Sequence, residues 1–452
     1  MKGEKLELKV EDLAYQGKAI AKLNSLVIFL DGGIPGDVVY AKIVKIKPNY
    51  MVASIEEILQ KSPFRTEPVC RHFGMCGGCR LQDLKYEEQL KFKTKQVKES
   101  INHIALLENS PVEDALASPD LFYYRNKMEF SFNRSDENET ILGLHQSGSY
   151  DKSFNLEECF LQSEASNRIV RWTRDFVRQK ELVPYNIKTH EGFLRYLMIR
   201  EAKSSGQMMV NLVTSSAEWD FSSEFSEGLR RESADVVSIV QNINPHLANI
   251  AFGERQVVLY GEDAIFERIG EFNFRISSNS FFQTNTRQAE RLYRLILDLA
   301  RLQGKEEVLD LYCGTGTISV FLSKSAGKVV GVESMQNAVR DAEENAKLNQ
   351  VRNCDFVCSD VRGFLKESAS QKNHIELAVL DPPRAGLSPK TVKYLLGLDV
   401  PRVIYVSCNP ATLSRDLRFF LDSGYDLRRV CPIDMFPHTF HIEVVSLLEK
   451  KD

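Results

Sequence analysis

The sequence has no long hydrophobic run, no signal-peptide core and no excess of basic charge. No window of its 452 residues approaches 18 uninterrupted apolar residues, so no membrane-spanning helix is predicted. The first ten residues contain no apolar stretch of signal-peptide length, and we expect a cytoplasmic protein without a membrane partner. The formal net charge is −4, so any surface that binds nucleic acid must be local.

Disulfide bonds are not indicated either. The chain has nine cysteines, an odd number, and no secretion signal, a combination that favours metal binding or catalysis. A chain of this length is too long for one ordinary core. We expect three domains, with bounds at 1–58, 59–275 and 276–452, and no pattern indicates an obligate protein partner.

Short runs that alternate apolar and polar residues predict a small β-barrel in residues 1–58. Turn signals separate these runs, among them Gly32-Gly33 and Pro35-Gly36. The pattern IPGDVV, followed by a lysine-bearing strand, resembles a TRAM domain, an OB-like barrel that binds RNA. Acidic and basic residues nearly balance in this segment, so a barrel with another role stays open.

Three cysteines, Cys70, Cys76 and Cys79, lie within ten residues beside two glycines that let the backbone wrap closely. A four-thiolate site needs one more ligand, and we assign Cys159 to that place. Four thiolates can hold zinc or an iron–sulfur cluster, and the spacing alone does not separate the two.

Residues 83–102 predict an amphipathic helix. Its apolar side carries Leu84, Leu90, Val97 and Ile101. Four lysines occupy the other sides: Lys91, Lys93, Lys95 and Lys98. We expect these lysines to form a solvated face rather than to contact phosphates.

The middle of the chain, residues 120–275, predicts a mixed α+β domain. Five strand-like pieces span 127–133, 141–146, 194–202, 207–214 and 256–261. The run Phe122-Tyr123-Tyr124-Arg125 joins aromatic rings to a cation, as in sites that hold single-stranded RNA. The edge of an apolar core is the other interpretation of this run.

From about residue 276 onward, strands and helices alternate with short loops, which predicts a doubly wound parallel sheet of the Rossmann type. Residues 306–313, 328–333 and 402–408 are typical of buried strands. In such sheets, ligands bind at the carboxyl ends of the strands. The groups at these ends are therefore the candidate site.

Cys408 follows the apolar run of residues 403–406 and precedes Asn409-Pro410, which ends the strand. A thiol at a strand end is a candidate nucleophile, although cysteine is also among the most commonly buried residues. Glu443, near the start of the final strand, is a candidate general base. A solvated glutamate is the alternative for that residue taken alone.

A glycine turn, Gly314-Thr315-Gly316, lies between the strand that carries Asp310 and the next helix. Glu333 follows about 20 residues later, where a carboxylate can accept both hydroxyls of a ribose. This pair alone fits NAD or S-adenosylmethionine. The turn lacks a third glycine, which favours a cofactor without a pyrophosphate.

These motifs together resemble the RNA uracil-C5 methyltransferases. The match in order and spacing includes FFQTN, DLYCGTGT, LDPPRAG, VSCNP and HTFHIE. With the TRAM-like barrel and the cysteine cluster, the chain is most similar to the branch that modifies 23S ribosomal RNA. The resemblance implies S-adenosyl-L-methionine as cofactor, a [4Fe–4S] cluster on the four cysteines, and RNA as partner.

The resemblance also implies a role for each residue. The Cys408 thiolate adds to C6 of uracil, C5 attacks the methyl group, and Glu443 removes the C5 proton from a base turned out of its stack. Cofactor contacts fall on Gln283, Tyr312, Glu333, Asp381, Thr317 and Asp360. Thr317 stands where some members of the family have Asn.

Three alternatives remain open from the sequence. The substrate could be tRNA rather than ribosomal RNA. Asp381-Pro382-Pro383 could orient an exocyclic or ring nitrogen of a base, with Cys408 incidental. The chain could also be an RNA-binding protein that carries a cluster and transfers no methyl group.

Overall fold

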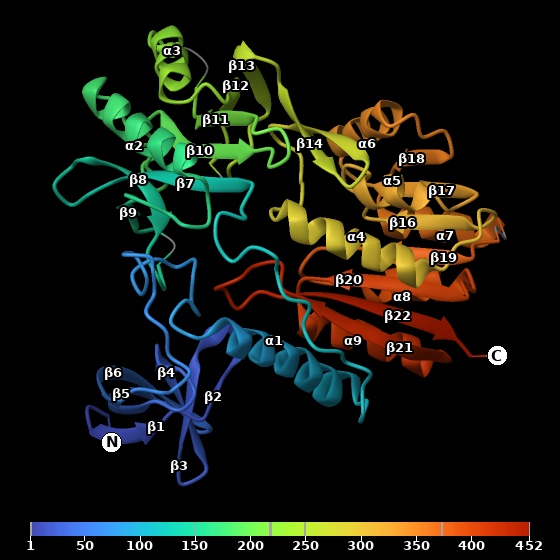
Figure 1. Cartoon of the computed structure of the whole chain (residues 1–452), viewed down its shortest axis with the longest axis horizontal. Helices are drawn as coiled ribbons and strands as arrows, with labels where there is room; N and C mark the ends of the chain where they lie inside the picture. Colours follow the sequence, from blue (N-terminus) through green and yellow to red (C-terminus); the bar gives the residue numbers. More distant parts are fainter. Residues whose placement is uncertain (1, 150, 217–218, 248–249, 372–373, 452) are drawn as a thin grey trace.

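The computed structural model describes residues 2–149, 151–216, 219–247, 250–371 and 374–451. Three large sheets follow one another along the chain, and the termini lie in different parts of the molecule (Figure 1). Within the described ranges, no helix is both long and apolar enough to cross a membrane.

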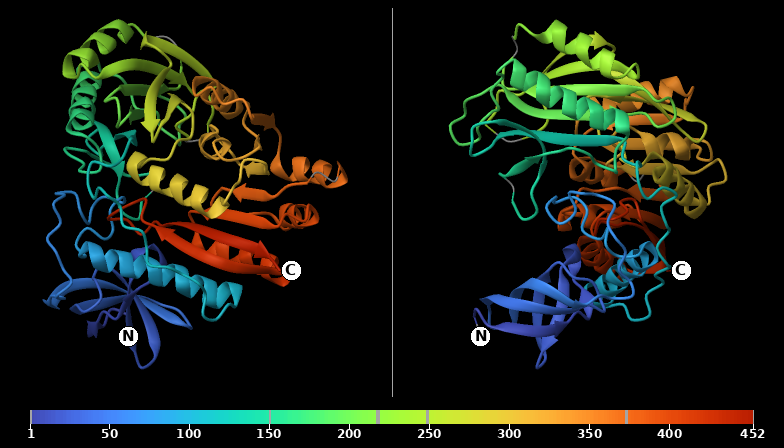
Figure 2. Two further views of the ribbon diagram at one scale, coloured as in Figure 1. Left: turned by 45° about the vertical axis from the view of Figure 1, so that its right-hand side comes forward. Right: turned by 60° about the vertical axis from the view of Figure 1, so that its left-hand side comes forward.

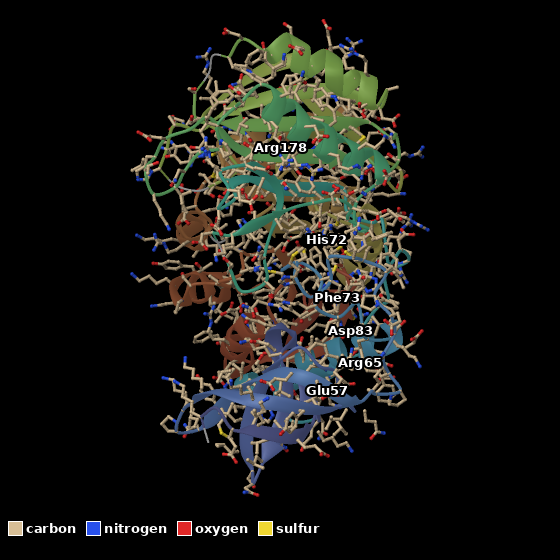
Figure 3. The ribbon with its side chains drawn as sticks, turned by 90° about the vertical axis from the view of Figure 1, so that its left-hand side faces the viewer. Glu57, Arg65, His72, Phe73, Asp83 and Arg178 are labelled. Atoms are coloured by element: carbon tan, nitrogen blue, oxygen red, sulfur yellow. The ribbon has the colours of Figure 1, made fainter. Side chains whose placement is uncertain are left out.

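The N-terminal sheet has the strand order β1-β5-β6-β4-β3-β2. Its strands are β1 (Lys5–Lys9), β2 (Asp12–Leu13), β3 (Ala19–Leu23), β4 (Leu26–Asp31), β5 (Val38–Ile46) and β6 (Tyr50–Gln60), with a 3-10 turn, η1 (Tyr15–Gly17). The buried Asp37 of the IPGD turn accepts hydrogen bonds from Ile34 N (2.8 Å) and Ser62 N (2.9 Å). Arg65 bridges Asp37 and Asp83, which attaches the barrel to the cysteine-rich segment (Figure 3).

Helix α1 (Tyr86–Ser100) continues into a π-helical turn, η2 (Ile101–Ala105). Val97 and Ile101 pack into the core of the C-terminal sheet, so this helix joins the N-terminal half to the last sheet (Figure 2). Lys91, Lys95 and Lys98 are exposed as expected. The expectation of a solvated face is wrong for Lys93, which is fully buried because Asp434 pairs with it.

The central sheet has the order β13-β12-β11-β10-β7-β8-β9. Its strands are β7 (Lys127–Arg134), β8 (Thr140–His145), β9 (Ser153–Asn155), β10 (Leu194–Glu201), β11 (Met208–Thr214), β12 (Val236–Ile243) and β13 (Arg255–Gly261). Helices α2 (Glu164–Gln179) and α3 (Ser222–Glu232) contribute to its core, and a hairpin follows, β14 (Ala264–Ile269) and β15 (Phe272–Ser277). Sequence analysis missed β12, because buried, hydrogen-bonded Gln241 and Asn242 interrupt its apolar pattern.

The C-terminal sheet has the order β18-β17-β16-β19-β20-β22-β21. Its strands are β16 (Glu307–Leu311), β17 (Lys328–Glu333), β18 (Cys354–Cys358), β19 (Leu377–Leu380), β20 (Arg402–Ser407), β21 (Tyr425–Ile433) and β22 (Glu443–Lys450). The helices are α4 (Thr286–Ala300), α5 (Thr317–Ser323), α6 (Gln336–Leu348), α7 (Val361–Gln371), α8 (Pro389–Gly397) and α9 (Pro410–Asp422).

Two apolar cores cover the two faces of this sheet, with α4 and α5 on one face and α1, α8 and α9 on the other. The strands β16 to β20 are parallel, whereas β22 runs antiparallel to both β20 and β21. The prediction of a doubly wound sheet therefore holds for its first five strands, and a final hairpin completes it. Because β22 is reversed, its first residue lies at the edge where the parallel strands end.

Candidate active site at the carboxyl edge of the C-terminal sheet

The strand register brings Cys408 and Glu443 to the same place. Ser407, the last residue of β20, pairs with Val444 of antiparallel β22. The residues next to this pair are Cys408 and Glu443, so the thiol and the carboxyl group lie opposite each other at the carboxyl edge. Asn409 then caps α9 by accepting a hydrogen bond from Ala411 N, which turns the chain sharply after the thiol.

Burial favours the neutral forms of both groups. Burial raises the pKa of Glu443 well above its ordinary value, and the nearby Asp381 carboxylate raises it further. Burial and the neighbouring Glu443 raise the pKa of Cys408 to about 11. Arg384 acts in the opposite direction on both groups, because its guanidinium stabilises negative charge. The thiol, the carboxyl group and the Arg384 cation are therefore close enough to influence one another electrostatically.

The loop that carries Arg384 is held by α9. The Arg384 carbonyl accepts hydrogen bonds from Asn409 Nδ2 (3.3 Å) and Thr412 Oγ1 (3.1 Å). The Arg384 side chain lies 3.3 Å from His441 Nδ1. Burial and nearby cations lower the pKa of His441 to about 4, so the ring is neutral at pH 7 and its nitrogen can accept from the guanidinium.

From the sequence, Arg384 was recognised only as part of the motif LDPPRAG, and no role was predicted for it. Its position one residue after two prolines was the available signal, because prolines fix the direction of a loop. The Arg384 side chain comes close to Cys408 because Arg384 follows β19, Cys408 follows β20, and these two strands are adjacent.

The glycine turn after β16 lies next to the end of β17. Glu333 Oε2 accepts from Gly314 N (3.3 Å), and Glu333 Oε1 accepts from Met335 N (2.8 Å). Glu333 Oε1 also accepts from Ser334 Oγ (3.1 Å), so among the described hydrogen bonds Oε2 is the oxygen that keeps a free lone-pair direction for a further donor. A Cβ atom at Gly314 would meet nothing within 4 Å, so one side of the turn is open to a ligand. The carboxylate and the open turn can together hold a hydroxyl-bearing ligand.

Tyr312 and Asp381 follow the neighbouring strands β16 and β19. Tyr312 has a φ of +66°, which is uncommon for a residue with a side chain. Burial and the nearby Asp310 carboxylate raise the pKa of Asp381 to about 7. Burial also raises the pKa of Asp310, to about 6. This concentration of acidic groups beside the turn suits a cationic ligand group.

The other three predicted cofactor contacts differ in burial and in their polar partners. Thr317 begins α5 and hydrogen-bonds the buried Tyr293 hydroxyl. Gln283 is buried before α4, and its carbonyl accepts from Asn126 Nδ2 (2.8 Å). Asp360 is exposed after β18, accepts from Gly363 N (3.1 Å) and acts electrostatically on Tyr312. The Thr317 hydroxyl therefore already has a hydrogen-bond partner, Tyr293, inside the protein.

Asn285, two residues after Gln283, caps α4 by accepting a hydrogen bond from Gln288 N (3.2 Å). Within the aromatic run, Tyr124 is buried and donates to Pro437 O (3.1 Å). Phe122 stacks on His438, with ring centroids 4.5 Å apart, while Tyr123 remains exposed. The core-edge interpretation therefore holds for Phe122 and Tyr124.

Cys70, Cys76, Cys79 and Cys159 line one cavity of about 500 Å³. The pKa of Cys79 is raised to about 12 by burial and by the three neighbouring sulfur atoms. In the parts of the chain that the structure describes, no group of three or more His, Cys, Asp or Glu side chains is arranged to hold a metal ion. The four thiols are free of disulfides. All four thiols line this cavity together with many other residues, His72 and Arg125 among them.

Comparison with known proteins places this geometry in a family. The model of the tRNA (uracil-5-)-methyltransferases matches residues 85–451, and that of the TRAM domain matches residues 1–55. The chain belongs to the tRNA (uracil-5-)-methyltransferase family. The predicted family, the enzyme class of RNA methyltransferase and the TRAM domain are thereby confirmed.

Relatives match the chain over nearly its whole length. It is 39% identical to an RNA methyltransferase of Chlorobaculum tepidum, over 100% of this chain and 97% of that protein. It is 38% identical to one of Bacteroides thetaiotaomicron, over 97% of this chain and all of that protein. The crystal structure of Pyrococcus abyssi tRNA (uracil-54, C5)-methyltransferase with S-adenosyl-L-homocysteine has a TM-score of 0.79 and 29% identity, and the match covers 98% of this chain and 99% of that one. The predicted fold class is confirmed.

Proposed function

We propose that the protein transfers a methyl group from S-adenosyl-L-methionine to C5 of a uridine in RNA, through a covalent bond between Cys408 and C6. The observation that carries this proposal is the register of β20 and β22, which sets a thiol opposite a buried carboxyl group. Family membership supports the substrate class, and the S-adenosyl-L-homocysteine in the Pyrococcus structure supports the cofactor.

Each residue has one task in the proposed reaction. The Cys408 sulfur forms a bond to C6, and the electron pair of the C5=C6 bond makes C5 nucleophilic. S-adenosyl-L-methionine would supply the methyl group as an electrophile and would leave as S-adenosyl-L-homocysteine. The carboxylate form of Glu443 then takes the C5 proton, the C5–H electron pair restores the double bond, and the C6–S bond breaks to return the Cys408 thiolate. Arg384 stabilises that thiolate.

The cofactor is proposed to lie along the ends of β16, β17 and β19. Glu333 would accept the ribose hydroxyls, with Oε2 free to accept beside the open Gly314. Asp381 would face the cationic methionine end. The remaining proposed contacts are Gln283, Tyr312, Thr317 and Asp360.

Trapping of the covalent intermediate tests this proposal. The protein is incubated with 5-fluorouridine RNA and S-adenosyl-L-methionine and then run on a denaturing gel. A slower RNA–protein band is expected for the wild type and not for Cys408→Ala, because the C5 fluorine of the substrate cannot leave as a proton does. Cys358→Ala, which alters an exposed cysteine on β18, is the matched control. A Cys408→Ala protein with full turnover would refute the covalent mechanism and favour nitrogen methylation.

The RNA substrate is proposed to be 23S ribosomal RNA. A TRAM domain together with four converging thiols supports this branch. Transfer RNA is the second candidate, because the Pyrococcus neighbour acts on tRNA and matches the full length of this chain. Methylation of purified 23S RNA and bulk tRNA, followed by mass mapping of 5-methyluridine, separates the two. Methylation of tRNA alone would exclude the ribosomal proposal.

A [4Fe–4S] cluster is proposed on Cys70, Cys76, Cys79 and Cys159. The shared cavity and the all-thiol donor set support it. Iron, sulfide and zinc content of the protein purified without oxygen tests the assignment. Four irons and four sulfides per chain are expected, and one zinc per chain would contradict the cluster.

We also propose that the three predicted segments, 1–58, 59–275 and 276–452, are folding domains of a cytoplasmic protein. The separate sheets support three units, and the bounds at 58/59 and 275/276 fall within β6 and β15. Limited proteolysis with mass mapping tests the bounds, since cleavage is expected first in exposed segments between the sheets.

A further inference from the structure

The segment between β21 and β22, residues 434–442, leads directly into Glu443; we name it the base loop. It leaves the sheet after Ile433 and returns at Glu443, and these two residues pair with each other. The base loop therefore starts and ends at the carboxyl edge. Any shift of the loop moves the candidate base relative to Cys408, which lies on a different strand.

Helix α1 holds the start of the base loop through a buried ion pair. Lys93 Nζ lies 2.5 Å from Asp434 Oδ1, and both side chains are fully buried. Lys93 also donates to Phe436 O (3.1 Å), and Tyr86 donates to Asp434 Oδ2 (2.9 Å). The ammonium, the carboxylate, the backbone carbonyl and the tyrosine hydroxyl thus all have polar partners inside the protein.

The middle of the base loop is held by the same helix and by the segment after Cys79. His438 has a φ of +66°, so its backbone needs support from its surroundings. Gln89 accepts from His438 N (3.0 Å) and donates to Leu81 O (2.9 Å). Arg80 N and Leu81 N both donate to His438 O, at 2.9 Å and 3.0 Å. The loop is therefore fixed by elements far from it in sequence.

A buried ion pair contributes little net stability, because desolvation of the two charges offsets their attraction. The pair does specify geometry, since a fully buried charge has few alternative partners. Here it selects one position of α1 relative to the base loop. That position also keeps His441 at Arg384, beside the thiol.

We propose that Lys93 and Asp434 are positioning residues for Glu443, and that their ion pair keeps the carboxyl group opposite Cys408 during proton removal. This inference rests on the proposed function. In the step concerned, Glu443 takes the C5 proton, the C5=C6 bond forms again and the C6–S bond breaks. A displaced Glu443 would slow this step alone and leave the methylated RNA attached to Cys408.

The double variant Lys93→Met/Asp434→Asn tests the proposal. Either single variant leaves one buried charge unpaired and is expected to unfold, whereas the double variant removes both charges and keeps an acceptor for Tyr86. We expect an unfolding midpoint near that of the wild type and unchanged KM values for RNA and S-adenosyl-L-methionine. We expect kcat to fall about 10²-fold, as misplacement of a catalytic group does, and a covalent adduct to accumulate with ordinary uridine RNA.

Lys91→Met is the matched control, because Lys91 lies on the same helix, is exposed and pairs only with Glu88 in the salt bridges that the structure describes. It is expected to match the wild type in every measurement. Should the double variant not fold, Tyr86→Phe removes the hydroxyl that donates to Asp434 and accepts from Ser118 N (2.8 Å). That variant is expected to lower kcat about tenfold, again with adduct accumulation.

A folded double variant with wild-type kcat and no accumulated adduct overturns the positioning role, as does a Tyr86→Phe protein with both properties. A fall in stability without adduct accumulation also overturns it, because a purely structural pair would act in that way. Failure of the proposed function has a different signature, since the wild type itself would then form no adduct with 5-fluorouridine RNA.

Discussion

The carboxyl edge of the C-terminal sheet and the four-cysteine cavity assemble reactive groups in two different ways. At the edge, Tyr312, Glu333, Asp381 and Cys408 follow successive parallel strands, so the hydrogen-bond ladder sets their spacing. In the cavity, three thiols come from one turn-rich segment, residues 70–79, which contains no regular strand or helix. The positions of the groups at the edge therefore follow from strand pairing, whereas the positions of the three thiols follow from the path of an irregular segment.

The two regions are nevertheless connected. Arg80 and Leu81, directly after Cys79, donate to the carbonyl of His438 in the base loop. Thr439 of the same loop lines the cysteine cavity. A structural change in the cavity can therefore be transmitted to Glu443 through the base loop. Substitutions in each region measure how far the edge and the cavity depend on each other.

The largest expected effect is on the edge. Glu443→Gln should lower kcat about 10²–10⁴-fold, because the C5 proton loses its acceptor. The KM for RNA should stay unchanged, since the amide keeps the size of the carboxyl group. Single-turnover kinetics with uridine RNA should show a stable methylated adduct on Cys408. Rapid release of that adduct would mean that another group removes the proton.

The second-largest effect is expected from a substitution in the four-cysteine cavity, on iron content and on stability. Cys79→Ala should remove iron from the protein and lower the free energy of unfolding by about 4 kcal/mol or more, as loss of a metal site does. S-adenosyl-L-methionine binding, measured by calorimetry under conditions where the variant is folded, should change less than about twofold. Cys358→Ala, at the exposed end of β18, should retain iron and stability. Loss of cofactor binding in Cys79→Ala would show that the edge depends on the cavity.

The third effect is on the thiol. Arg384 lowers the pKa of Cys408, so Arg384→Gln should raise that pKa further above its value of about 11. Less thiolate is then present at pH 8 to 9, and adduct formation should slow about three- to tenfold, since Arg384 is exposed and screened by water. The pH profile of adduct formation should move to higher pH. An unchanged profile, as expected for the surface control Lys393→Gln, would remove Arg384 from the proposed mechanism.

The smallest effect is on stability. Because burial raises the pKa values of Glu443 and Asp381, the folded protein binds more protons than the unfolded chain above about pH 4. Stability should therefore fall as the pH rises from about 4 toward 7, where Asp381 titrates. Glu443→Gln removes one of these groups and should therefore be more stable than the wild type at pH 7. Urea unfolding across this range measures the difference, and parallel curves for the two proteins would contradict it.

Sequence reasoning worked best where a local pattern controls the structure. The apolar run before Cys408 predicted β20 and its end, because Asn409-Pro410 stops any strand. It failed for β12, where buried amides occupy strand positions, and for Lys93, which hydrophobic periodicity assigns to solvent. Both errors have the same cause, since a distant partner satisfies a polar group that the local sequence presents as exposed.

The sequence by itself determined the family, the alternation of strands and helices, and which reactive residues follow strand ends. These features depend on short-range patterns of apolar, glycine and proline residues. Only the tertiary structure decided that β22 is reversed, that Glu443 therefore faces Cys408, and that Lys93 of α1 fixes the loop before that carboxyl group. Such pairings join residues tens to hundreds of positions apart, and their energy comes from burial that exists only once the sheets have packed.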